Sequence, residues 1–293
     1  TLSPEEMLAQ LRDIGVVICA ASDDLAPADR KLYALRDVTG TVESIPMIAA
    51  SIMSKKIAEG TASLVLDVKV GSGAFMKDAT SAAHLARTMV RLGTDAGVRT
   101  SALLTEMSEP LGLAVGNAIE VAEAVEVLAG GGPADVVELA IALAREMVHL
   151  AGLSVDPAEV LASGAAMDSW RAMVAAQGGD PDAALPRPQE VEIVTAPAAG
   201  VISKMDALAV GMAAWRLGAG RARKEDTVQA AAGVLCLAKP GDEITQGAPL
   251  FELHTDTADR IPAAAAELAA AVEVVPSGRP VPRRAIVMNT IRG

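Results

Sequence analysis

Hydrophobic and polar positions follow two alternating periods along the first two thirds of the chain. Stretches with helical spacing are separated by short apolar or β-branched runs that are typical of strands. Helices are expected near 4–13, 42–56, 80–96, from Asn117 onward, 134–151, 157–163 and 166–177, and strands near 16–20, 64–70 and 101–105. This alternation predicts an α/β fold in which helices flank a mostly parallel sheet.

The pattern changes near residue 180. The segment 178–189 contains three prolines and predicts a linker, placed at about 180–190. Short strand-like runs and turns follow it, near 191–194, 201–202, 233–237 and 249–253. Residues 191–293 are therefore expected to form a small α+β module that closes the chain.

Composition and charge exclude several classes of protein. Of the 293 residues 51% are hydrophobic, which is enough to bury a core, and only 2% are aromatic, which disfavours binding of single-stranded nucleic acid by stacking. The net charge of −12 disfavours a phosphate backbone as partner. No uncharged apolar run approaches the ~20 residues that a membrane span needs.

The cysteines and the first residues bear on the compartment. Cys19 and Cys236 lie far apart, so a disulfide framework or a zinc cluster is not expected, and a cytoplasmic location fits best. Ser3, Pro4 and Glu6 have the spacing of a capping box at a helix start. The basic and apolar regions of a signal peptide are not found there.

The first candidate for chemistry is a group of polar side chains around the predicted helix 42–56. Ser51 and Lys55 are four residues apart and should share one helix face, and Arg36 precedes the turn that enters this helix. A forked cation, a point cation and a hydroxyl suit a flat ring with two carbonyl oxygens and an N–H between them. The two cations would also stabilise negative charge on such a ring as it leaves. Spacing alone leaves open an ordinary exposed helix, with Arg36 paired to Asp37.

A second candidate is the segment Gly71-Ser72-Gly73-Ala74-Phe75, which follows the predicted strand 64–70. A glycine-rich turn after a buried strand is a place where backbone amides can meet a ligand. The segment has neither the full G-x-G-x-x-G pattern nor a Walker lysine, so a tight turn that needs glycine is the alternative. Asp67 and Lys69 within the strand suggest a polar cleft edge, where they could pair across the sheet.

A third candidate is the segment 111–117 together with Glu123. Its main-chain carbonyls and one carboxylate could hold a hard cation, but an exposed glutamate beside a helix N-terminus is the plainer alternative. Asn117 and Glu120 have the spacing of a helix cap. The three histidines do not cluster in the sequence, so neither a nucleophile–base pair nor a histidine metal site is expected.

Several segments closely resemble the thymidine/pyrimidine-nucleoside phosphorylase family. They are Tyr33-Ala34-Leu35-Arg36-Asp37-Val38-Thr39, Ser51-Ile52-Met53-Ser54-Lys55-Lys56 and Asp67-Val68-Lys69-Val70-Gly71-Ser72-Gly73-Ala74-Phe75-Met76, with 111–123 and the part from 191 onward. The resemblance implies a pentosyltransferase of pyrimidine salvage that splits thymidine with inorganic phosphate into a free base and a pentose 1-phosphate. It implies a homodimer without a cofactor, and it leaves the choice between thymidine and uridine open.

The resemblance also assigns roles to individual residues. The base-binding, catalytic trio corresponds to Arg36, Ser51 and Lys55. The residues that line the base pocket correspond to Tyr33, Val42, Ile48, Ile52 and Phe75. Some members bind a structural K⁺ or Ca²⁺. The ligands of that ion correspond here to the carbonyls of Leu111 and Ala114 and the side chain of Glu123.

The resemblance implies a two-lobed nucleoside phosphorylase fold with a barrel-like closing module. Residues 1–27 and 59–179 would form the α/β lobe, 28–58 part of a small helical lobe, 180–190 the linker and 191–293 the closing module. The family's phosphate-binding motif, of the type Lys-His-Ser-Thr-Gly-Gly, has no match here, and about the first third of the family's chain is not in the sequence. We therefore expect this sequence to hold the base-binding half of the site.

Two functions from other classes are alternatives to this one. The closing module resembles a biotinyl/lipoyl-like carrier barrel, but His254-Thr255-Asp256-Thr257 stands where a carrier has its lysine, and Lys204 comes too early, so this hypothesis is discarded. A phosphoribosyltransferase could share a two-lobed architecture, but the acidic magnesium ligands that it needs are not found in the sequence. A role limited to base binding or structure stays open as well.

Overall fold

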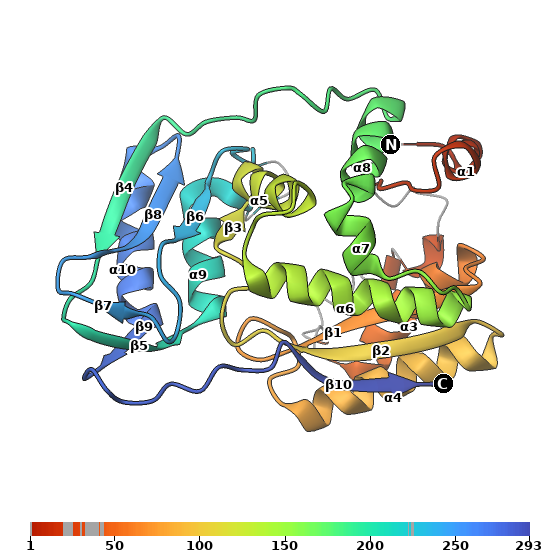
Figure 1. The fold of residues 1–293 in the computed structure, drawn as a ribbon, viewed down its shortest axis with the longest axis horizontal. Helices are drawn as coiled ribbons and strands as arrows, with labels where there is room; N and C mark the ends of the chain where they lie inside the picture. Colours follow the sequence, from red (N-terminus) through yellow and green to blue (C-terminus); the bar gives the residue numbers. More distant parts are fainter. Residues whose placement is uncertain are drawn as a thin grey trace.

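The structure is a computed structural model that describes residues 2–19, 26–29, 31–32, 41, 44–221, 223 and 226–293. Tyr33, Arg36 and Val42 lie outside the described residues. Figure 1 shows two groups of elements, one around the strands β1, β2 and β10 and one around the remaining strands. The loops after β2 and the helix α5 lie between these groups.

Up to residue 177 the helices agree closely with the sequence predictions, whereas the two helices of the closing module were not predicted. The helices are α1 (Pro4–Asp13), α3 (Ile45–Ala58), α4 (Ala79–Asp95), α5 (Ala118–Leu128), α6 (Ala134–Ala151), α7 (Pro157–Ala162), α8 (Ala165–Ala176), α9 (Ala207–Ala214) and α10 (Ile261–Ala271), with a π-helical turn (Trp215–Ala219) and a 3₁₀ turn (Ala258–Arg260). The capping box of α1 is confirmed, since Ser3 and Glu6 bond reciprocally. The expected strand at 16–20 is wrong for its described part, because residues 16–19 form no strand and Ile18 is 68% exposed.

The first sheet has the strand order β1-β2-β10. Its strands are β1 (Ser63–Val70), β2 (Arg99–Glu106) and β10 (Val287–Arg292). β1 and β2 run parallel, with Ser63 opposite Arg99, whereas β10 runs antiparallel to β2. The mixed α/β class is confirmed. The expectation of a mostly parallel sheet is wrong for the described strands, because β1 and β2 pair in parallel and the other strand pairs are antiparallel. The last strand returns to the first sheet, a long-range pairing that no local pattern indicates.

Helices cover both faces of this sheet (Figure 1). Alternate residues of β1 point into a core with α3 and α4, where Met53 and Leu104 are almost fully buried. On the other face lies α6, which contacts β1 and β2. Arg292 of β10 donates from Nε and Nη2 to Glu146 of α6, at 2.8 and 2.6 Å. This two-pronged pair holds the last strand to α6 and lowers the pKa of Glu146 below its ordinary value.

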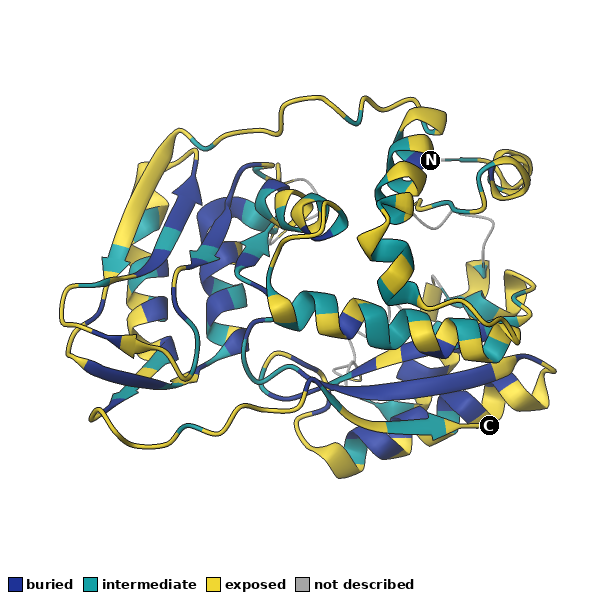
Figure 2. Ribbon diagram, viewed as in Figure 1, coloured by how far each residue is buried: buried dark blue, intermediate teal, exposed yellow. Residues whose placement is uncertain are grey.

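The closing module contains two antiparallel sheets with the strand orders β3-β6-β8-β4 and β7-β5-β9. Their strands are β3 (Ala114–Gly116), β4 (Glu190–Thr195), β5 (Gly200–Met205), β6 (Gly233–Cys236), β7 (Glu243–Ile244), β8 (Pro249–Thr255) and β9 (Val272–Val275). They enclose a core with α9 and α10 around Phe251, which is completely buried. Figure 2 shows the contrast between the buried β8 and the exposed outer strand β4. Because β3 precedes the linker in sequence, the module takes one strand from the first half of the chain.

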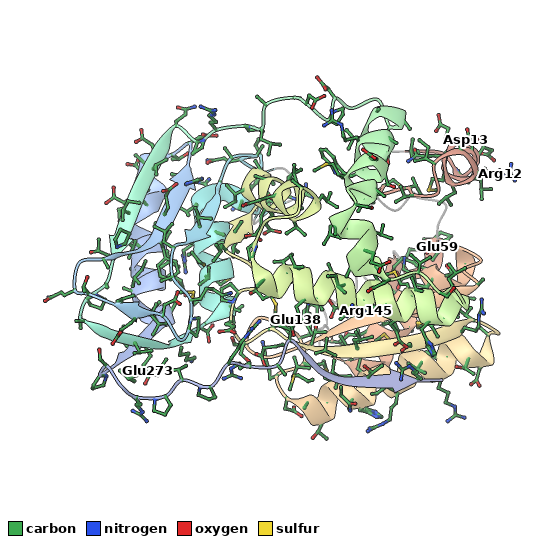
Figure 3. All side chains as sticks on the ribbon, viewed as in Figure 1. Arg12, Asp13, Glu59, Glu138, Arg145 and Glu273 are labelled. Atoms are coloured by element: carbon green, nitrogen blue, oxygen red, sulfur yellow. The ribbon has the colours of Figure 1, made fainter. Side chains whose placement is uncertain are left out.

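The segment between the two groups agrees with the linker prediction, since residues 177–189 form neither helix nor strand. The domain boundaries themselves stay a prediction. Charged side chains cover the outer surfaces of both groups, as Arg12 on α1 and Glu273 on β9 illustrate in Figure 3. Within the described part of the chain no helix combines the length and the apolar character that crossing a membrane requires.

Candidate functional site

Helix α3 places Ser51 and Lys55 on the same side of the helix, as their spacing predicts. The neighbouring residues Ala49 and Met53, each 1% exposed, anchor the helix in the core beneath α4. The Ser51 side chain is buried as well, and the Lys55 side chain keeps 29% of its surface exposed. The helix is thus rigidly held by its apolar face while Lys55 reaches toward solvent.

The polar groups of Ser51 and Lys55 converge on a carboxylate. Lys55 Nζ lies 2.5 Å from Asp29 Oδ2 and donates to Ser51 Oγ at 3.0 Å and to the Ser51 carbonyl. Ser51 Oγ in turn donates to Asp29 Oδ2 at 3.1 Å. The two functional groups are therefore oriented by a third residue before any substrate arrives. Asp29 was missed by sequence reasoning, because a single aspartate 22 residues before Ser51 carries no spacing signal.

The expected pocket residues lie in different environments. Ile48 is buried in the core of the first half, and Ile52 packs against the same core from its edge. Phe75 is 57% exposed, so much of its ring surface is free. The structure thus brings Ser51 and Lys55 together on one helix, whereas the expected positions Tyr33, Arg36 and Val42 fall among the residues that it does not describe.

The glycine-rich segment after β1 is a tight turn whose amides bond within the protein. Gly71 donates to the Met76 carbonyl at 3.0 Å, Gly73 to the Met107 carbonyl at 2.9 Å and Ala74 to the Gly71 carbonyl at 3.1 Å. Gly71 has φ +135°, and a Cβ there would stand 2.4 Å from the backbone nitrogen of Ser108. Glycine is required for this close approach. The structure therefore supports the alternative of a tight turn over a row of free amides.

The two charges of β1 pair along the strand and not across the sheet. Lys69 Nζ lies 2.7 Å from Asp67 Oδ2, two residues away on the same face. Thr105 of the neighbouring strand donates to the other oxygen of Asp67. The cation of this strand is therefore already paired with a neighbouring carboxylate.

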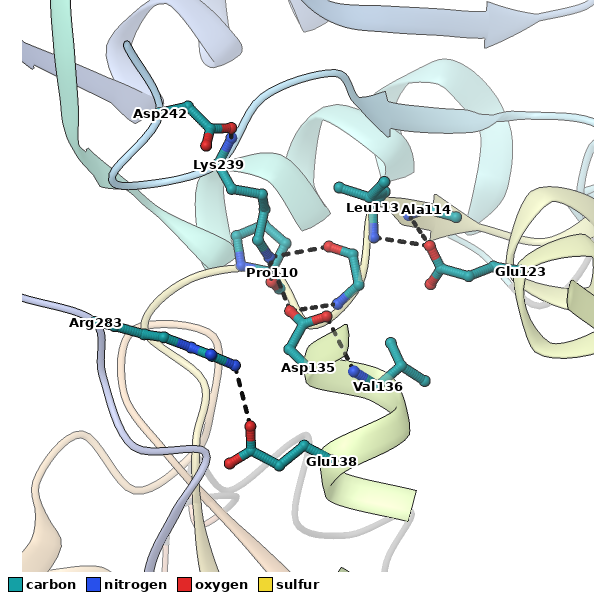
Figure 4. A network of polar contacts seen from close by, with 11 residues as sticks. Pro110, Leu113, Ala114, Glu123, Asp135, Val136, Glu138, Lys239, Asp242 and Arg283 are labelled. Carbon is teal, nitrogen blue, oxygen red and sulfur yellow. Dashed lines mark hydrogen bonds and ion pairs between the residues drawn. The ribbon is translucent and has the colours of Figure 1, made fainter. Parts of the chain in front are cut away.

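Glu123 is a structural partner of the loop before β3, and its interpretation as an exposed glutamate is wrong. Its Oε2 accepts from the amides of Leu113 and Ala114 at 2.8 and 3.0 Å (Figure 4). Burial raises the pKa of Glu123, the two N–H donors oppose this, and the nearby Asp135 and Glu120 add to the rise. A half-buried carboxylate with other carboxylates nearby is an environment that favours a cation.

The predicted cap at Asn117 is not formed. Asn117 Nδ2 donates instead to the carbonyls of Ala219 and Gln229 at 3.0 and 3.1 Å, which ties α5 to the closing module. Glu120 accepts from the amide of Gly116 at 2.7 Å. Tertiary partners thus replace the local cap that the spacing indicates.

Within the described residues no three or more His, Cys, Asp or Glu side chains gather into a group that could hold a metal ion. His254 is nearly buried and its Nε2 lies 2.5 Å from Oε1 of Glu252 on the same strand. This carboxylate contact gives His254 a partner on its own strand.

Lys239 of the closing module makes a second convergent cluster, which sequence reasoning also missed. Its Nζ donates to the carbonyls of Pro110 and Gly112, the latter at 3.0 Å, and lies 3.2 Å from Asp135 Oδ2 (Figure 4). Asp135 Oδ2 also accepts from the Gly112 amide at 3.1 Å. The partners lie more than a hundred residues from Lys239 in sequence, so no spacing pattern could reveal them.

Comparisons with known proteins agree with this architecture. Residues 1–172, more than half of the chain, match the model of the glycosyl transferase family a/b domain, and residues 201–275 match that of the pyrimidine nucleoside phosphorylase C-terminal domain. The second match lies within the closing module.

Relatives with known names are similar over nearly the same range. The chain is 60% identical to a thymidine phosphorylase of Mycobacterium tuberculosis over 269 residues, which is 92% of this chain and 63% of that protein. It is 46% identical to a pyrimidine-nucleoside phosphorylase of Bacillus subtilis and 43% identical to one of Geobacillus stearothermophilus, in each case over 87% of this chain and 62% of the relative. The chain thus spans somewhat less than two thirds of the length of these relatives. It belongs to the family of thymidine and pyrimidine-nucleoside phosphorylases.

Proposed function

We propose that the protein catalyses the reversible phosphorolysis of thymidine, with inorganic phosphate as co-substrate and no cofactor. The products are thymine and 2-deoxyribose 1-phosphate, and uridine and deoxyuridine are candidate further substrates. The observation that carries this proposal is the convergence of Ser51 and Lys55 on one rigid helix face, at the positions that the family resemblance assigns to base binding. The 60% identity to a thymidine phosphorylase supports the same substrate.

The hydrogen bonds around Ser51 suit recognition of a pyrimidine base. The Ser51 hydroxyl donates a hydrogen bond to Asp29, so its lone pairs remain to accept from Lys55 and from the ring N–H of a base. Lys55 has three donors, of which one can turn to a ring carbonyl oxygen, and Arg36 would donate to the other carbonyl. Together the three residues match the acceptor, donor and acceptor edge of thymine.

The same groups would lower the barrier to bond cleavage. As the bond between the sugar C1′ and the ring nitrogen breaks, its electron pair moves into the pyrimidine, and the positive charges of Lys55 and Arg36 stabilise the anion that forms. A phosphate oxygen bonds to C1′ from the opposite side of an oxocarbenium-like sugar, and the departing base then takes up a proton. An oriented ammonium group lowers the barrier most when it lies beside the base on which the negative charge develops.

The rest of the pocket follows from the family resemblance. Tyr33, Val42, Ile48, Ile52 and Phe75 would line the base, and the exposed ring of Phe75 has free surface for such a contact. In this proposal 28–58 belongs to a small helical lobe, 1–27 and 59–179 to the α/β lobe, and 191–293 to the closing module. Closure of the lobes would bring base and phosphate together and exclude water.

A structural cation, a dimer and a compartment complete the proposal. K⁺ or Ca²⁺ would bind the carbonyls of Leu111 and Ala114 and the half-buried carboxylate of Glu123, whose pKa is raised. The family suggests a homodimer, and the free thiols Cys19 and Cys236 fit the reducing cytoplasm.

The test is phosphate-dependent release of base from thymidine and from uridine, with synthesis from thymine and deoxyribose 1-phosphate as the reverse assay. We expect release only when phosphate is present, and the ratio of kcat/KM for the two nucleosides then gives the specificity. Release that is independent of phosphate would indicate hydrolysis and overturn the proposal. So would the absence of turnover in both directions in a protein that includes the phosphate-binding segment.

A further inference from the structure

One loop between β2 and β3, residues 107–113, forms hydrogen bonds with elements of both halves of the chain. We call it the junction loop. Met107 donates to the Val70 carbonyl at 2.7 Å and accepts from the Gly73 amide at 2.9 Å, while the Ser108 carbonyl accepts from the Ala207 amide at 3.1 Å. The junction loop is therefore bonded both to the turn that carries Phe75 and to the first residue of α9.

Lys239 of the closing module forms hydrogen bonds with the other end of the junction loop. The ammonium group has three donors and three acceptors around it, namely the carbonyls of Pro110 and Gly112 and the carboxylate of Asp135. The side chains of Lys239 and Asp135 are only 20% and 17% exposed. The backbone of Lys239 is fixed in turn, because its amide donates to Asp242 Oδ2 at 2.8 Å. The lysine is therefore anchored at both ends.

The Glu109 carboxylate interacts electrostatically with this ammonium group. Burial raises the pKa of Glu109, and Lys239 and Arg284 oppose the rise while Glu106 and Asp135 add to it. Glu106 is itself 3.6 Å from Arg284. Removal of the lysine charge would leave the Asp135 carboxylate and two carbonyl oxygens facing each other. That set of oxygen donors is one that a hard monovalent cation accepts.

We propose that Lys239 is a positioning residue whose ammonium group acts as a built-in monovalent cation, holding the junction loop and through it the turn that carries Phe75. The closing module would thus set the shape of the base pocket without touching the base. The kinetic part of this inference rests on the proposed phosphorolysis, whereas the cation-like role of Lys239 does not.

The cation-like role is tested by chemical rescue in the intact protein. In Lys239→Ala we expect the melting temperature to fall by roughly 5 °C, because Asp135 and two carbonyls lose a nearly buried partner. Potassium or ethylammonium chloride should restore at least half of this loss, compared with choline chloride at equal ionic strength. The rescue is scored as the extra response of the variant over its parent.

Two further variants make the outcome specific. Lys204→Ala removes an exposed lysine of the same module, which lies 3.6 Å from Asp206, and should change neither the melting temperature nor the response to cations. Lys239→Gln keeps two donors without the charge, so it should fold more readily and still show the response. Equal stability of the Lys239 and Lys204 variants, or a loss of stability that no cation rescues, would overturn the proposal.

The kinetic consequence is measured on the same variants. We expect Lys239→Gln to raise the KM for thymidine about fivefold, with a smaller effect on kcat, and potassium to reverse this change. Lys204→Ala should match the parent. An unchanged KM alongside rescue of stability would overturn the link to the pocket. If neither the parent nor any variant turns over nucleoside, the proposed function fails. The melting data still decide the role of Lys239.

Discussion

Lys55 and Lys239 place the same chemical group in nearly the same kind of surroundings, in two different regions of the molecule. Each ammonium group contacts one aspartate and at least one main-chain carbonyl, and each side chain is less than one third exposed. The difference lies in where the partners come from. Lys55 bonds to Ser51 of its own helix and to Asp29, whereas Lys239 bonds to two separate elements far from it in sequence.

This difference separates a group that can exchange partners from one that holds a structure together. Two of the contacts of Lys55 are made to Ser51, one turn earlier in the same helix, and do not depend on the position of another segment. The ammonium group can therefore turn toward a substrate oxygen at little cost. The contacts of Lys239 join the closing module to α6 and the junction loop, and losing them would separate these elements. The same chemistry thus suits ligand recognition at one site and assembly at the other.

The largest expected effect is on turnover at the first lysine. Lys55→Met should lower kcat/KM for thymidine phosphorolysis by roughly 100- to 1000-fold, because an oriented cation that stabilises the leaving base is lost. Its matched control is Lys56→Met. Lys56 is the next residue in the sequence and pairs with Glu59 on the outer side of the helix. The control should stay within about twofold of the parent. A drop of less than about threefold for Lys55→Met would remove Lys55 from the proposed chemistry.

The next effect concerns the coupling between Lys239 and Asp135. A double-mutant cycle with Lys239→Gln and Asp135→Asn, followed by urea unfolding, should give a coupling free energy of about 1–3 kcal/mol. The reason is that the pair is nearly buried and shares the Gly112 peptide as a further partner. Additive single effects would mean that the two regions do not differ in the way described above.

A smaller coupling is expected for the corresponding pair at the first site. The cycle with Lys55→Gln and Asp29→Asn should give about 0.5–1 kcal/mol of unfolding free energy, since the lysine is more exposed and keeps its bonds to Ser51 when Asp29 is changed. The measurement is again urea unfolding at neutral pH. A coupling larger than that of Lys239 with Asp135 would reverse the comparison.

The smallest effect is a difference in pH dependence between two glutamates. The pKa of Glu146 is lowered from 4.5 by its bonds to Arg292, so its contribution to stability is present above about pH 4.5 and is lost as the pH falls through the lowered pKa. The pKa of Glu123, beside the junction loop, is raised from 4.5 by burial. Its contribution is therefore present below about pH 4.5 and is lost as the pH rises through the raised pKa.

Unfolding titrations between about pH 3 and 8 should show these opposite signs. Relative to Glu146→Gln the parent should gain stability as the pH rises, and relative to Glu123→Gln it should lose stability as the pH rises. Glutamine keeps a carbonyl acceptor for the amides of Leu113 and Ala114, so the second comparison isolates the charge. Curves of the same sign would show that burial does not govern the ionisation of Glu123.

Much of the fold could be predicted from local patterns. α6 begins and ends at the predicted residues, α1 has the capping box that Ser3 and Glu6 indicate, and the strands β1 and β2 lie where the sequence predicts strands. These features depend on contacts within a few residues or on hydrophobic periodicity. The shared helix face of Ser51 and Lys55 belongs to the same class, because spacing along a helix determines it.

The contacts that distinguish the two lysines were decided by the tertiary structure. The position of Asp29 beside Lys55, the return of β10 to β2 and the cluster around Lys239 each join segments that lie far apart in the chain. Many of their partners are main-chain carbonyls and amides, which every residue carries and which leave no mark in a sequence. Residue spacing along the chain determined which side chains share a helix face, and only the packing of distant segments decided which charges those side chains meet.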